Sequence, residues 1–229
     1  MSNAKFNVPS PHNESILEYK PGSSEKKLLL KELATMRKKP EKIPLVINGE
    51  SLWKKKTATV FEPHKKNSVL AESQLADEKD VVTAIEGCVA AQKDWNRLPW
   101  EERAGVFLKA ADLLTTKYRQ KMNAATILGQ SKTCFQSEID AVCELADFFR
   151  FNAAFAQKIY EEQPLHSPRG QWNRSSNRGL EGFVFAVSPF NFSSIAVNLA
   201  CAPALMGCSV LWKPAHTAML SAWVGLNIL

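Results

Sequence analysis

The sequence lacks the features that mark a membrane-spanning or a metal-binding protein. No apolar run approaches the roughly 20 residues that cross a bilayer, and the five cysteines form no Cys-x-x-Cys pair. The four histidines are far apart, and none belongs to a His-x-x-x-His arrangement. We therefore expect no membrane span, no metal, and reduced cysteines that serve as small buried hydrophobic residues of an intracellular protein.

Basic residues are in moderate excess and are concentrated early in the chain. The net charge is +6, with lysine-rich runs at 37–39, 54–56 and 65–66. Aromatic residues among these runs are limited to Trp53 and Phe61, whereas nucleic-acid surfaces interleave aromatic and basic residues. The pattern favours a solvated lysine face and no nucleic-acid partner.

The composition is otherwise ordinary for a globular protein, with 45% hydrophobic and 23% charged residues. The first 40 residues are polar and rich in Ser, Pro and Lys, which predicts an arm with one helix at 25–37, capped by Ser23 or Ser24. The first 20 residues carry both signs of charge and no arginine. They make a poor transit peptide, so a complete N terminus would favour the cytoplasm.

Short strands and then three amphipathic helices are predicted after the arm. Residues 43–53 are typical of a hairpin around a type I′ turn at Asn48-Gly49, and further strands are expected at 57–61 and 68–72. The second helix begins near Pro99 and its apolar spacing continues to Met122, and the third runs from about 131 to 160. The first begins at Asp77, and its expected buried side consists of Val81, Val82, Ile85, Cys88, Val89 and Trp95.

The segment from residue 181 to residue 214 is the most informative part of the chain. Residues 183–187 and 210–212 are short, continuously apolar runs, as expected of parallel strands covered on both faces. The roughly 20 residues between them suffice for one helical crossover. Ligands bind at the carboxyl ends of such strands, where Asn191 and Lys213 lie. An amide donor and a cation both suit an anionic cofactor or a developing oxyanion.

These residues carry a family resemblance. The motif Ser188-Pro189-Phe190-Asn191-Phe192, followed by Lys213-Pro214, resembles the aldehyde dehydrogenase superfamily, and within it the 1-pyrroline-5-carboxylate dehydrogenases. Supporting motifs follow the same order along the chain, at 110–112, 129–132, 138–140, 147–152, 162–164 and 178–183. The resemblance extends from about Tyr19 to the last residue.

The resemblance implies an α/β fold, namely the N-terminal part of an aldehyde dehydrogenase fold. It divides the chain into an arm (1–40), the hairpin and helical part of the cofactor-binding domain (41–160), an oligomerisation flap (161–180) and the start of a Rossmann-like parallel sheet (181–229). The flap segment is polar and broken by prolines, with no strong helix pattern.

The resemblance also implies a function. It is the NAD-dependent oxidation of L-glutamate 5-semialdehyde to glutamate in proline degradation, in the mitochondrial matrix, by a homo-oligomer that binds a small-molecule aldehyde. Members carry the nucleophilic cysteine, the glutamate base and a second glycine-rich segment in the latter half of a longer chain, and none of these is found here. Residues 218–229 resemble an unfinished helix, so we expect an N-terminal portion that is inactive alone.

Two alternatives stay open. One is a noncatalytic truncated isoform that acts as an oligomerisation or regulatory module. The other is an aldehyde dehydrogenase of a different substrate, including a CoA-acylating type.

Asn191 and Lys213 are the main candidates for chemistry. By resemblance, Asn191 stabilises the alkoxide that forms when a thiolate adds to the aldehyde, a role that requires a fixed neutral donor about 2.7–3.1 Å from the oxygen. From the residues alone, an asparagine that caps the following helix is the favoured interpretation. Lys213 matches the lysine that holds the adenosine ribose hydroxyls of NAD, and the alternative is an ordinary surface lysine.

The same turn and the segment after Lys213 complete the predicted cofactor site. Ser188, Pro189 and Phe190 are expected beside the cofactor. His216 stands where relatives often carry a small or acidic residue, and a neutral imidazole is a poorer acceptor for two hydroxyls than a carboxylate.

Glu144 is the main candidate on the third helix. It shares a helix face with Phe148, Phe151 and Phe155, and a carboxylate in such surroundings needs a partner or a raised pKa. A salt bridge to a nearby Arg or Lys is one interpretation. By resemblance, Glu144 borders the aldehyde pocket, and Phe192 forms part of its aromatic wall.

Three other residues near this helix are not expected to act on a substrate. Glu138 and Asp140 are interpreted as solvated helix charges. Cys134 follows a Gly-Gln pair, but its spacing does not match a nucleophile loop, so no catalytic role is predicted for it.

Overall fold

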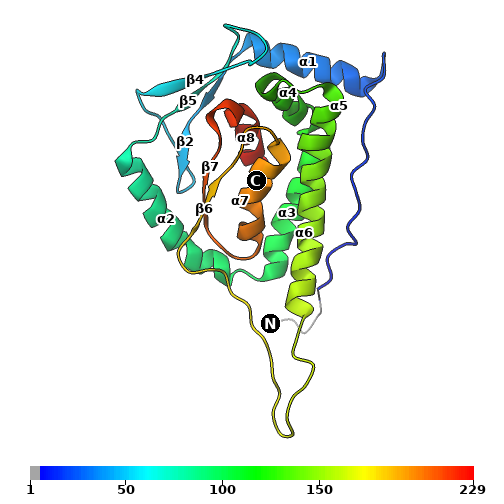
Figure 1. The fold of residues 1–229 in the computed structure, drawn as a ribbon, viewed down its shortest axis with the longest axis vertical. Coiled ribbons are helices and arrows are strands. Elements are labelled where there is room, and N and C mark those ends of the chain that lie inside the picture. Colours follow the sequence, from blue (N-terminus) through cyan, green and yellow to red (C-terminus); the bar gives the residue numbers. More distant parts are fainter. Residues whose placement is uncertain (1–5) are drawn as a thin grey trace.

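The structure is a computed structural model that describes residues 6–229, and it mixes helices with small β-sheets (Figure 1). Helices α3 (Trp100–Thr115), α6 (Glu144–Glu161) and α7 (Ser193–Leu205) pack against one another in the middle of the molecule. None of the helices within residues 6–229 is both long and apolar enough to cross a bilayer. The predicted α/β fold is confirmed.

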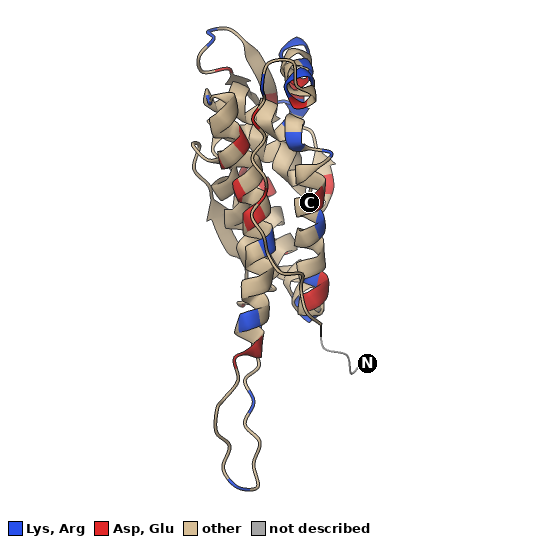
Figure 2. Ribbon diagram, turned by 90° about the vertical axis from the view of Figure 1, so that its right-hand side faces the viewer, with Lys and Arg blue, Asp and Glu red and all other residues tan. Residues whose placement is uncertain are grey.

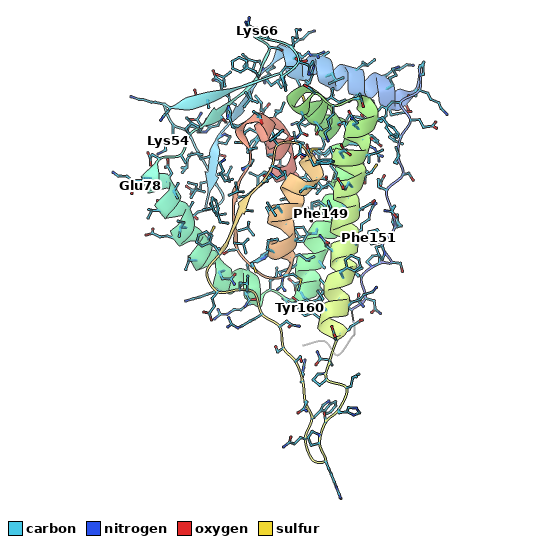
Figure 3. All side chains as sticks on the ribbon, in the orientation of Figure 1. Lys54, Lys66, Glu78, Phe149, Phe151 and Tyr160 are labelled. Carbon is cyan, nitrogen blue, oxygen red and sulfur yellow. The ribbon has the colours of Figure 1, made fainter. Side chains whose placement is uncertain are left out.

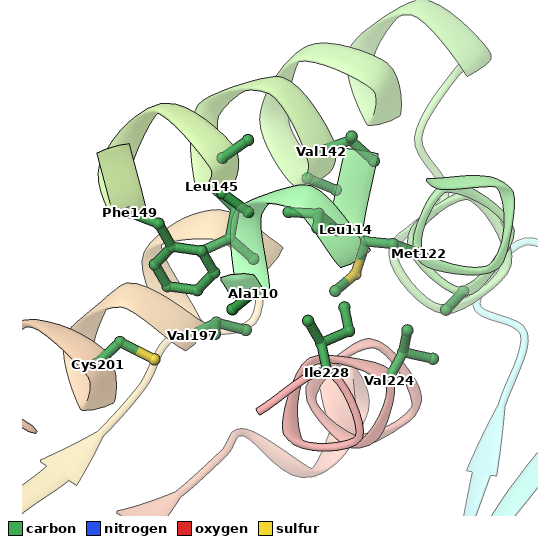
Figure 4. Close-up of a cluster of buried hydrophobic side chains, with 14 of the residues drawn as sticks. Ala110, Leu114, Met122, Val142, Leu145, Phe149, Val197, Cys201, Val224 and Ile228 are labelled. Carbon is green, nitrogen blue, oxygen red and sulfur yellow. The ribbon is translucent and has the colours of Figure 1, made fainter. Parts of the chain in front are cut away.

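One hydrophobic core joins these helices to the end of the chain (Figure 4). Phe149 of α6 lies beside Val197 of α7, and Leu114 of α3 belongs to the same cluster. Val224 of α8 (Met219–Leu226) and Ile228 close the core from below. α8 is therefore part of the core. It ends at Leu226, and the side chain of the C-cap residue Asn227 donates to the Trp223 carbonyl at 2.7 Å.

The strands before residue 75 form two small sheets. β1 (Glu41–Ile43) pairs in parallel with β5 (Val69–Gln74), which pairs antiparallel with β4 (Thr57–Phe61). β2 (Leu45–Ile47) and β3 (Glu50–Leu52) make the predicted hairpin, and positive φ angles at Asn48 and Gly49 agree with a type I′ turn. Ile43 does not belong to this hairpin. Pro44, which has no N–H to donate, separates it from β2 and leaves it in β1.

The helix predicted in the arm is present, whereas the helix predicted from Pro99 is divided. α1 (Ser24–Lys38) begins after Ser23, whose side chain accepts from the Lys26 N–H, as predicted. The helix expected from Pro99 to Met122 is divided into α3 and α4 (Arg119–Gln130). Thr115 and Thr116 hydroxyls donate back to backbone carbonyls at this break, and such bonds compete with the regular ladder.

α2 (Glu78–Arg97) begins at the predicted Asp77 cap, but its buried side is shifted around the helix from the one expected, and only Ile85, Cys88 and Trp95 of the expected residues are half-buried. Val81, Val82 and Val89 are exposed, whereas the buried residues are Asp80, Ala84 and Gln92. Polar contacts accompany this orientation. Asp80 pairs at 2.7 Å with Lys54, which is labelled in Figure 3 near Glu78, the first residue of the helix. Gln92 donates to the Leu180 carbonyl and accepts from the Ser209 N–H.

The third predicted helix consists of three pieces. Ser131 adopts a left-handed conformation, and α5 (Cys134–Ser137) then leads through a π-helical segment, η1 (Glu138–Cys143), into α6. The predicted burial of residues 145–156 on several sides is confirmed for most positions, because α6 contacts both α3 and α7. Phe155 is an exception and is exposed.

β6 (Val184–Val187), α7 and β7 (Val210–Lys213) form the predicted parallel strand–helix–strand unit. Within the described residues, β6 is covered on one face only. Ala186 is buried against the helices, whereas Phe185 and Val187 are 58% and 53% exposed. The expectation of two covered faces is therefore wrong for β6 in this chain. The 3-10 turn η2 (His216–Ala218) connects β7 to α8.

Residues 162–183 form a long loop that projects away from the body and returns to it (Figure 1). Gln163 joins the two arms of the loop by hydrogen bonds with the backbone of Ser175. The loop has no strand in the structure, and it presents Leu165 and Trp172 to solvent, each 94% exposed.

The return of this loop depends on a glycine, which gives a first prediction. A Cβ at Gly179 would lie 2.3 Å from the Gly207 carbonyl oxygen, and the Gly179 N–H donates to Asn96 Oδ1 at 2.7 Å. We expect Gly179→Ala to destabilise the protein by about 1–3 kcal/mol, because backbone must move to accept the methyl group. Thermal melts should show a lower Tm than wild type.

Gly105→Ala is the matched control. A Cβ at Gly105 meets nothing within 4 Å on the exposed side of α3, so this change should stabilise the helix by about 0.5–1 kcal/mol. Equal melting temperatures for the two variants would contradict the close approach of Gly179 and Gly207.

Candidate active site at the carboxyl ends of β6 and β7

Two neighbouring strand ends bring Asn191 and Lys213 to one edge of a sheet. Val187, which ends β6, pairs with Lys213, which ends β7, and the Ser188 N–H donates to the Lys213 carbonyl at 3.3 Å. The chain turns over residues 188–192 and enters α7 at Ser193. Asn191 and Lys213 are both exposed. Their placement at adjacent strand ends is confirmed, and their roles stay predictions.

The side chain of Asn191 is not used as a helix cap. The N-cap residue of α7 is Phe192, and no side chain caps this helix. Within residues 6–229, the Asn191 amide makes no hydrogen bond to protein. The capping interpretation is therefore wrong, and the amide is available to a ligand.

The turn that carries Asn191 is anchored on both sides. Before it, Ser188 is buried and its hydroxyl accepts from Trp212 Nε1 at 3.0 Å. After it, the Ser193 hydroxyl bonds Thr126 Oγ1 and Gln130 Nε2, each at 2.8 Å. A donor mounted between such fixed points loses little conformational freedom when it binds a developing charge.

Glu144 contacts this turn through a hydroxyl rather than through a salt bridge. It begins α6 and accepts a hydrogen bond from the buried Ser194 hydroxyl, the second residue of α7. No arginine or lysine of the described residues pairs with it, so the salt-bridge interpretation is wrong. The bond joins α6 to α7 beside Phe192, which is half-buried.

One neighbour of the site was not predicted from the sequence. Lys132 lies over the Phe192 ring, with Nζ 3.9 Å from the ring centroid, and it pairs with Asp140. Lys132 belongs to one of the motifs on which the family resemblance rests, but sequence spacing alone gives no reason to join it to Phe192. Asp140 is accordingly paired and mostly buried, so its interpretation as a solvated charge is wrong.

The remaining predicted cofactor residues lie around the same edge. Lys213 forms no ion pair within the described part of the chain, whereas Pro189 and Phe190 are exposed on the turn. His216 Nε2 lies 3.1 Å from the Thr59 carbonyl oxygen. Because a carbonyl only accepts, Nε2 carries the proton, and the Nδ1 of the neutral ring is left as an acceptor.

Residues 189–191 of the turn are exposed. Two clefts of about 220 Å³ and 440 Å³ are formed elsewhere, one between α1 and α8 and one between α1, residues 17–19 and α5. Neither is lined by residues 188–192 or by Lys213.

Comparison with known proteins identifies the family. The sequence profile described as "Aldehyde dehydrogenase family" matches residues 52–229, which is more than half of the chain. The chain belongs to the aldehyde dehydrogenase family. Among curated relatives, it is 45% identical over 221 residues to the mitochondrial delta-1-pyrroline-5-carboxylate dehydrogenase of Dictyostelium discoideum. It is 46% identical over 217 residues to the corresponding mitochondrial enzyme of Mus musculus.

Solved structures agree with this family assignment. The delta-pyrroline-5-carboxylate dehydrogenase of Mycobacterium tuberculosis, crystallised with NAD and cobalamin, is 47% identical and superposes with a TM-score of 0.97 over 100% of this chain and 43% of that chain. A Thermus enzyme of the same name with bound NAD, at 24% identity and a TM-score of 0.87, shares the fold.

This aldehyde dehydrogenase chain covers only part of its relatives. The two curated matches cover 96% and 95% of the chain but 40% and 38% of the Dictyostelium and mouse proteins.

None of the four cysteines with a shifted pKa has the properties of a family nucleophile. Burial raises the pKa of the Cys88 and Cys134 thiols, with the charge of Glu138 adding to the effect at Cys134. Burial raises the pKa of Cys143 and of Cys201 to about 12. A nucleophilic cysteine needs a lowered pKa, whereas the pKa of each of these thiols is raised.

Proposed function

We propose that this chain is the N-terminal portion of an NAD-dependent 1-pyrroline-5-carboxylate dehydrogenase, which oxidises L-glutamate 5-semialdehyde to glutamate in proline degradation. One observation carries the proposal: the Asn191 amide and the Lys213 ammonium lie at adjacent strand ends with no protein partner within residues 6–229, and the turn that carries Asn191 is fixed at Ser188 and Ser193. Relatives of this name match nearly the whole chain at 45% and 46% identity.

In this proposal Asn191 supplies the oxyanion donor. Addition of a thiolate to an aldehyde moves the carbonyl electron pair onto oxygen, and the resulting alkoxide needs a fixed, neutral donor. The Asn191 amide is neutral at every pH and is held on an anchored turn. Glu144 and Phe192 border the aldehyde pocket on the side of α6.

The edge residues fit the adenosine end of NAD. Lys213 would donate to the ribose hydroxyls, and the free Nδ1 of His216 is suited to accept from a hydroxyl. Ser188, Pro189 and Phe190 form the surface of the turn against which the cofactor would lie. When bound, NAD supplies the acceptor for the hydride that leaves the aldehyde carbon.

We further propose that the chain is inactive alone and that the complete enzyme works in the mitochondrial matrix. The thiols of the four cysteines with raised pKa are poor nucleophiles, and the chain spans about 40% of the relatives' length. The Dictyostelium and mouse relatives are both named as mitochondrial proteins.

An activity assay tests the function. The longest reading frame that contains residues 1–229 should form NADH from L-glutamate 5-semialdehyde with a higher kcat/KM than from other aldehydes. Dependence on coenzyme A would point instead to an acylating aldehyde dehydrogenase. The 229-residue chain should show no turnover, and measurable turnover would contradict its proposed inactivity.

Loss of the Lys213 ammonium should weaken NAD binding. We expect Lys213→Ala to raise the Kd for NAD about tenfold, which corresponds to about 1.4 kcal/mol for a lost charged hydrogen bond. Isothermal titration calorimetry on the enzyme measures this. Lys55→Ala removes an exposed lysine that belongs to neither strand and should leave the Kd unchanged. Equal affinities for the two variants would exclude Lys213 from the cofactor site.

A second candidate function rests on the 162–183 loop. Its exposed Leu165 and Trp172 are unusual for a surface loop, because large apolar side chains in solvent often mark a contact with another chain. A noncatalytic isoform that joins full-length subunits through residues 161–180 would use them. Size-exclusion chromatography with full-length enzyme distinguishes this candidate, and failure of wild type to co-elute, or co-elution unchanged in Trp172→Ser, would exclude it.

A further inference from the structure

Lys132 is a largely buried cation beside the candidate active site. It lies between α4 and α5, and its side chain is only 12% exposed. A buried ammonium is stable only with a partner, which Asp140 provides with a side chain that is 20% exposed. The pair therefore keeps a desolvated positive charge close to the protein interior.

The face of Phe192 is the second partner of this charge. The Nζ–centroid distance of 3.9 Å is well inside the roughly 6 Å limit for a cation–π contact. Two other lysines lie over rings, Lys117 over Tyr118 at 5.1 Å and Lys158 over Phe155 at 5.8 Å, and both are exposed. The contact between Lys132 and Phe192 is the shortest of the three and involves the least solvated cation. We therefore expect Phe192 to be held more firmly than Tyr118 or Phe155.

One stretch of helix holds the chain at two points after Asn191. Asp140 and Glu144 are four residues apart, so they project from neighbouring turns of the η1–α6 helix. Asp140 holds Lys132, which covers Phe192, and Glu144 holds Ser194. Asn191 itself has no bond within residues 6–229 and depends on its neighbours for orientation.

We propose that Lys132 is a positioning residue for the oxyanion donor: its contact with the Phe192 ring, braced by Asp140, fixes the direction in which the adjacent Asn191 amide points. This role rests on the proposed function of Asn191. Lys132 does not touch the reacting atoms, and its effect on the reaction passes through the turn.

Hydrogen exchange on the 229-residue chain tests the structural half of the proposal. Lys132→Met keeps the apolar stem of the side chain but removes the charge, which leaves the Asp140 carboxylate unpaired. The double variant Lys132→Met with Asp140→Asn removes that carboxylate charge as well. We expect amide exchange in residues 188–195 to accelerate about tenfold in both variants, with α3 and α4 unchanged. Lys117→Met, which removes a different cation–π contact, should leave residues 188–195 as in wild type.

A second pair of variants covers the case in which Lys132→Met does not fold. Phe192→Leu removes the ring and keeps an apolar side chain, so it should accelerate exchange in the same segment, whereas Lys132→Arg should restore wild-type exchange. Unchanged exchange at 188–195 in Lys132→Met or in Phe192→Leu, or equal acceleration throughout the chain, would overturn the proposal.

Kinetics of the complete enzyme test the functional half. Lys132→Met should lower kcat about tenfold with KM for the aldehyde unchanged, and it should have no further effect in an Asn191→Ala background, because both changes remove the same donor. If Asn191→Ala leaves kcat intact, the proposed function of Asn191 fails. If Asn191→Ala lowers kcat and Lys132→Met lowers it again by the full factor, only the positioning role fails.

Discussion

Replacing Glu138 with glutamine should lower the free energy of unfolding by about 3–5 kcal/mol, because it leaves a buried cation without its main counter-charge. The Glu138 side chain has no exposed surface, and the side chain of its partner Arg119 is nearly as buried. This pair lies where η1 meets α4, and it is the most deeply buried ion pair of the described residues.

Glutamine cannot replace the carboxylate because every neighbour of Glu138 is a donor. Its oxygens accept from Arg119 Nε at 3.1 Å, from the Tyr19 hydroxyl at 2.8 Å and from Asn123 Nδ2 at 2.7 Å. They also accept from the Leu17 N–H at 2.9 Å. A carboxylate accepts at both oxygens, whereas the NH₂ group of glutamine would face donors and leave them unsatisfied.

The same hydrogen-bond network holds the N-terminal arm, so the destabilisation caused by Glu138→Gln should extend to residues 8–19. The arm runs along α6 (Figure 2), where Glu14 accepts from Arg119 at 2.7 Å and from Arg150 at 2.8 Å. Burial alone would raise the pKa of Glu14, but the hydrogen bonds from the two arginines hold it below its ordinary value. With Glu138 neutralised, Glu14 is the remaining carboxylate that pairs with Arg119.

Thermal denaturation measures the effect. A loss of about 3–5 kcal/mol corresponds to a decrease in Tm of roughly 6–20 °C for a protein of this size. Glu86→Gln makes the same chemical change at an exposed position of α2 and should shift Tm by little. If Glu138→Gln had the same Tm as the Glu86→Gln control, the buried pair would contribute no net stability.

Glu138 also shows where prediction from the sequence reaches its limit. As an acidic residue in a polar stretch of a helix it resembles a solvated charge, and its interpretation as one is wrong. Its hydrogen-bond partners include Leu17 and Tyr19, which are more than 100 residues away in the sequence. Contacts of this range leave no local pattern.

The orientation of α2 was missed for the same reason. The helical period defines its apolar side, but polar bonds from Asp80 and Gln92 to other segments go with a buried side that is shifted away from Val81, Val82 and Val89. The β2–β3 hairpin and the β6–α7–β7 unit were predicted correctly, since they depend on turn residues and on apolar runs that are adjacent in sequence. The candidate site was found because Asn191 and Lys213 end such runs. The contact between Lys132 and Phe192 was not predicted, because it forms only when the chain folds.

Asn191→Ala should reduce kcat of the complete enzyme by about 10²–10³, the usual effect of removing one oxyanion donor. The side chain is free of protein partners within the described residues, so its removal leaves no buried group unsatisfied and should not change Tm. A donor aimed at the alkoxide acts more strongly on the transition state than on the bound aldehyde, so KM should change little. Steady-state NADH formation measures both constants.

Two further variants separate charge stabilisation from structural damage. Asn191→Asp is nearly isosteric but places a negative charge beside the developing alkoxide, so its kcat should be no higher than that of Asn191→Ala. Asn198→Ala removes an asparagine of α7, the helix that follows the turn. Its side chain bonds Asn152 at 2.9 Å, and the change should leave kcat near wild type. If Asn191→Asp retains wild-type kcat, no alkoxide develops at this turn. A loss of kcat in Asn198→Ala as large as in Asn191→Ala would mean that disturbance of α7, rather than loss of a donor, lowers the rate.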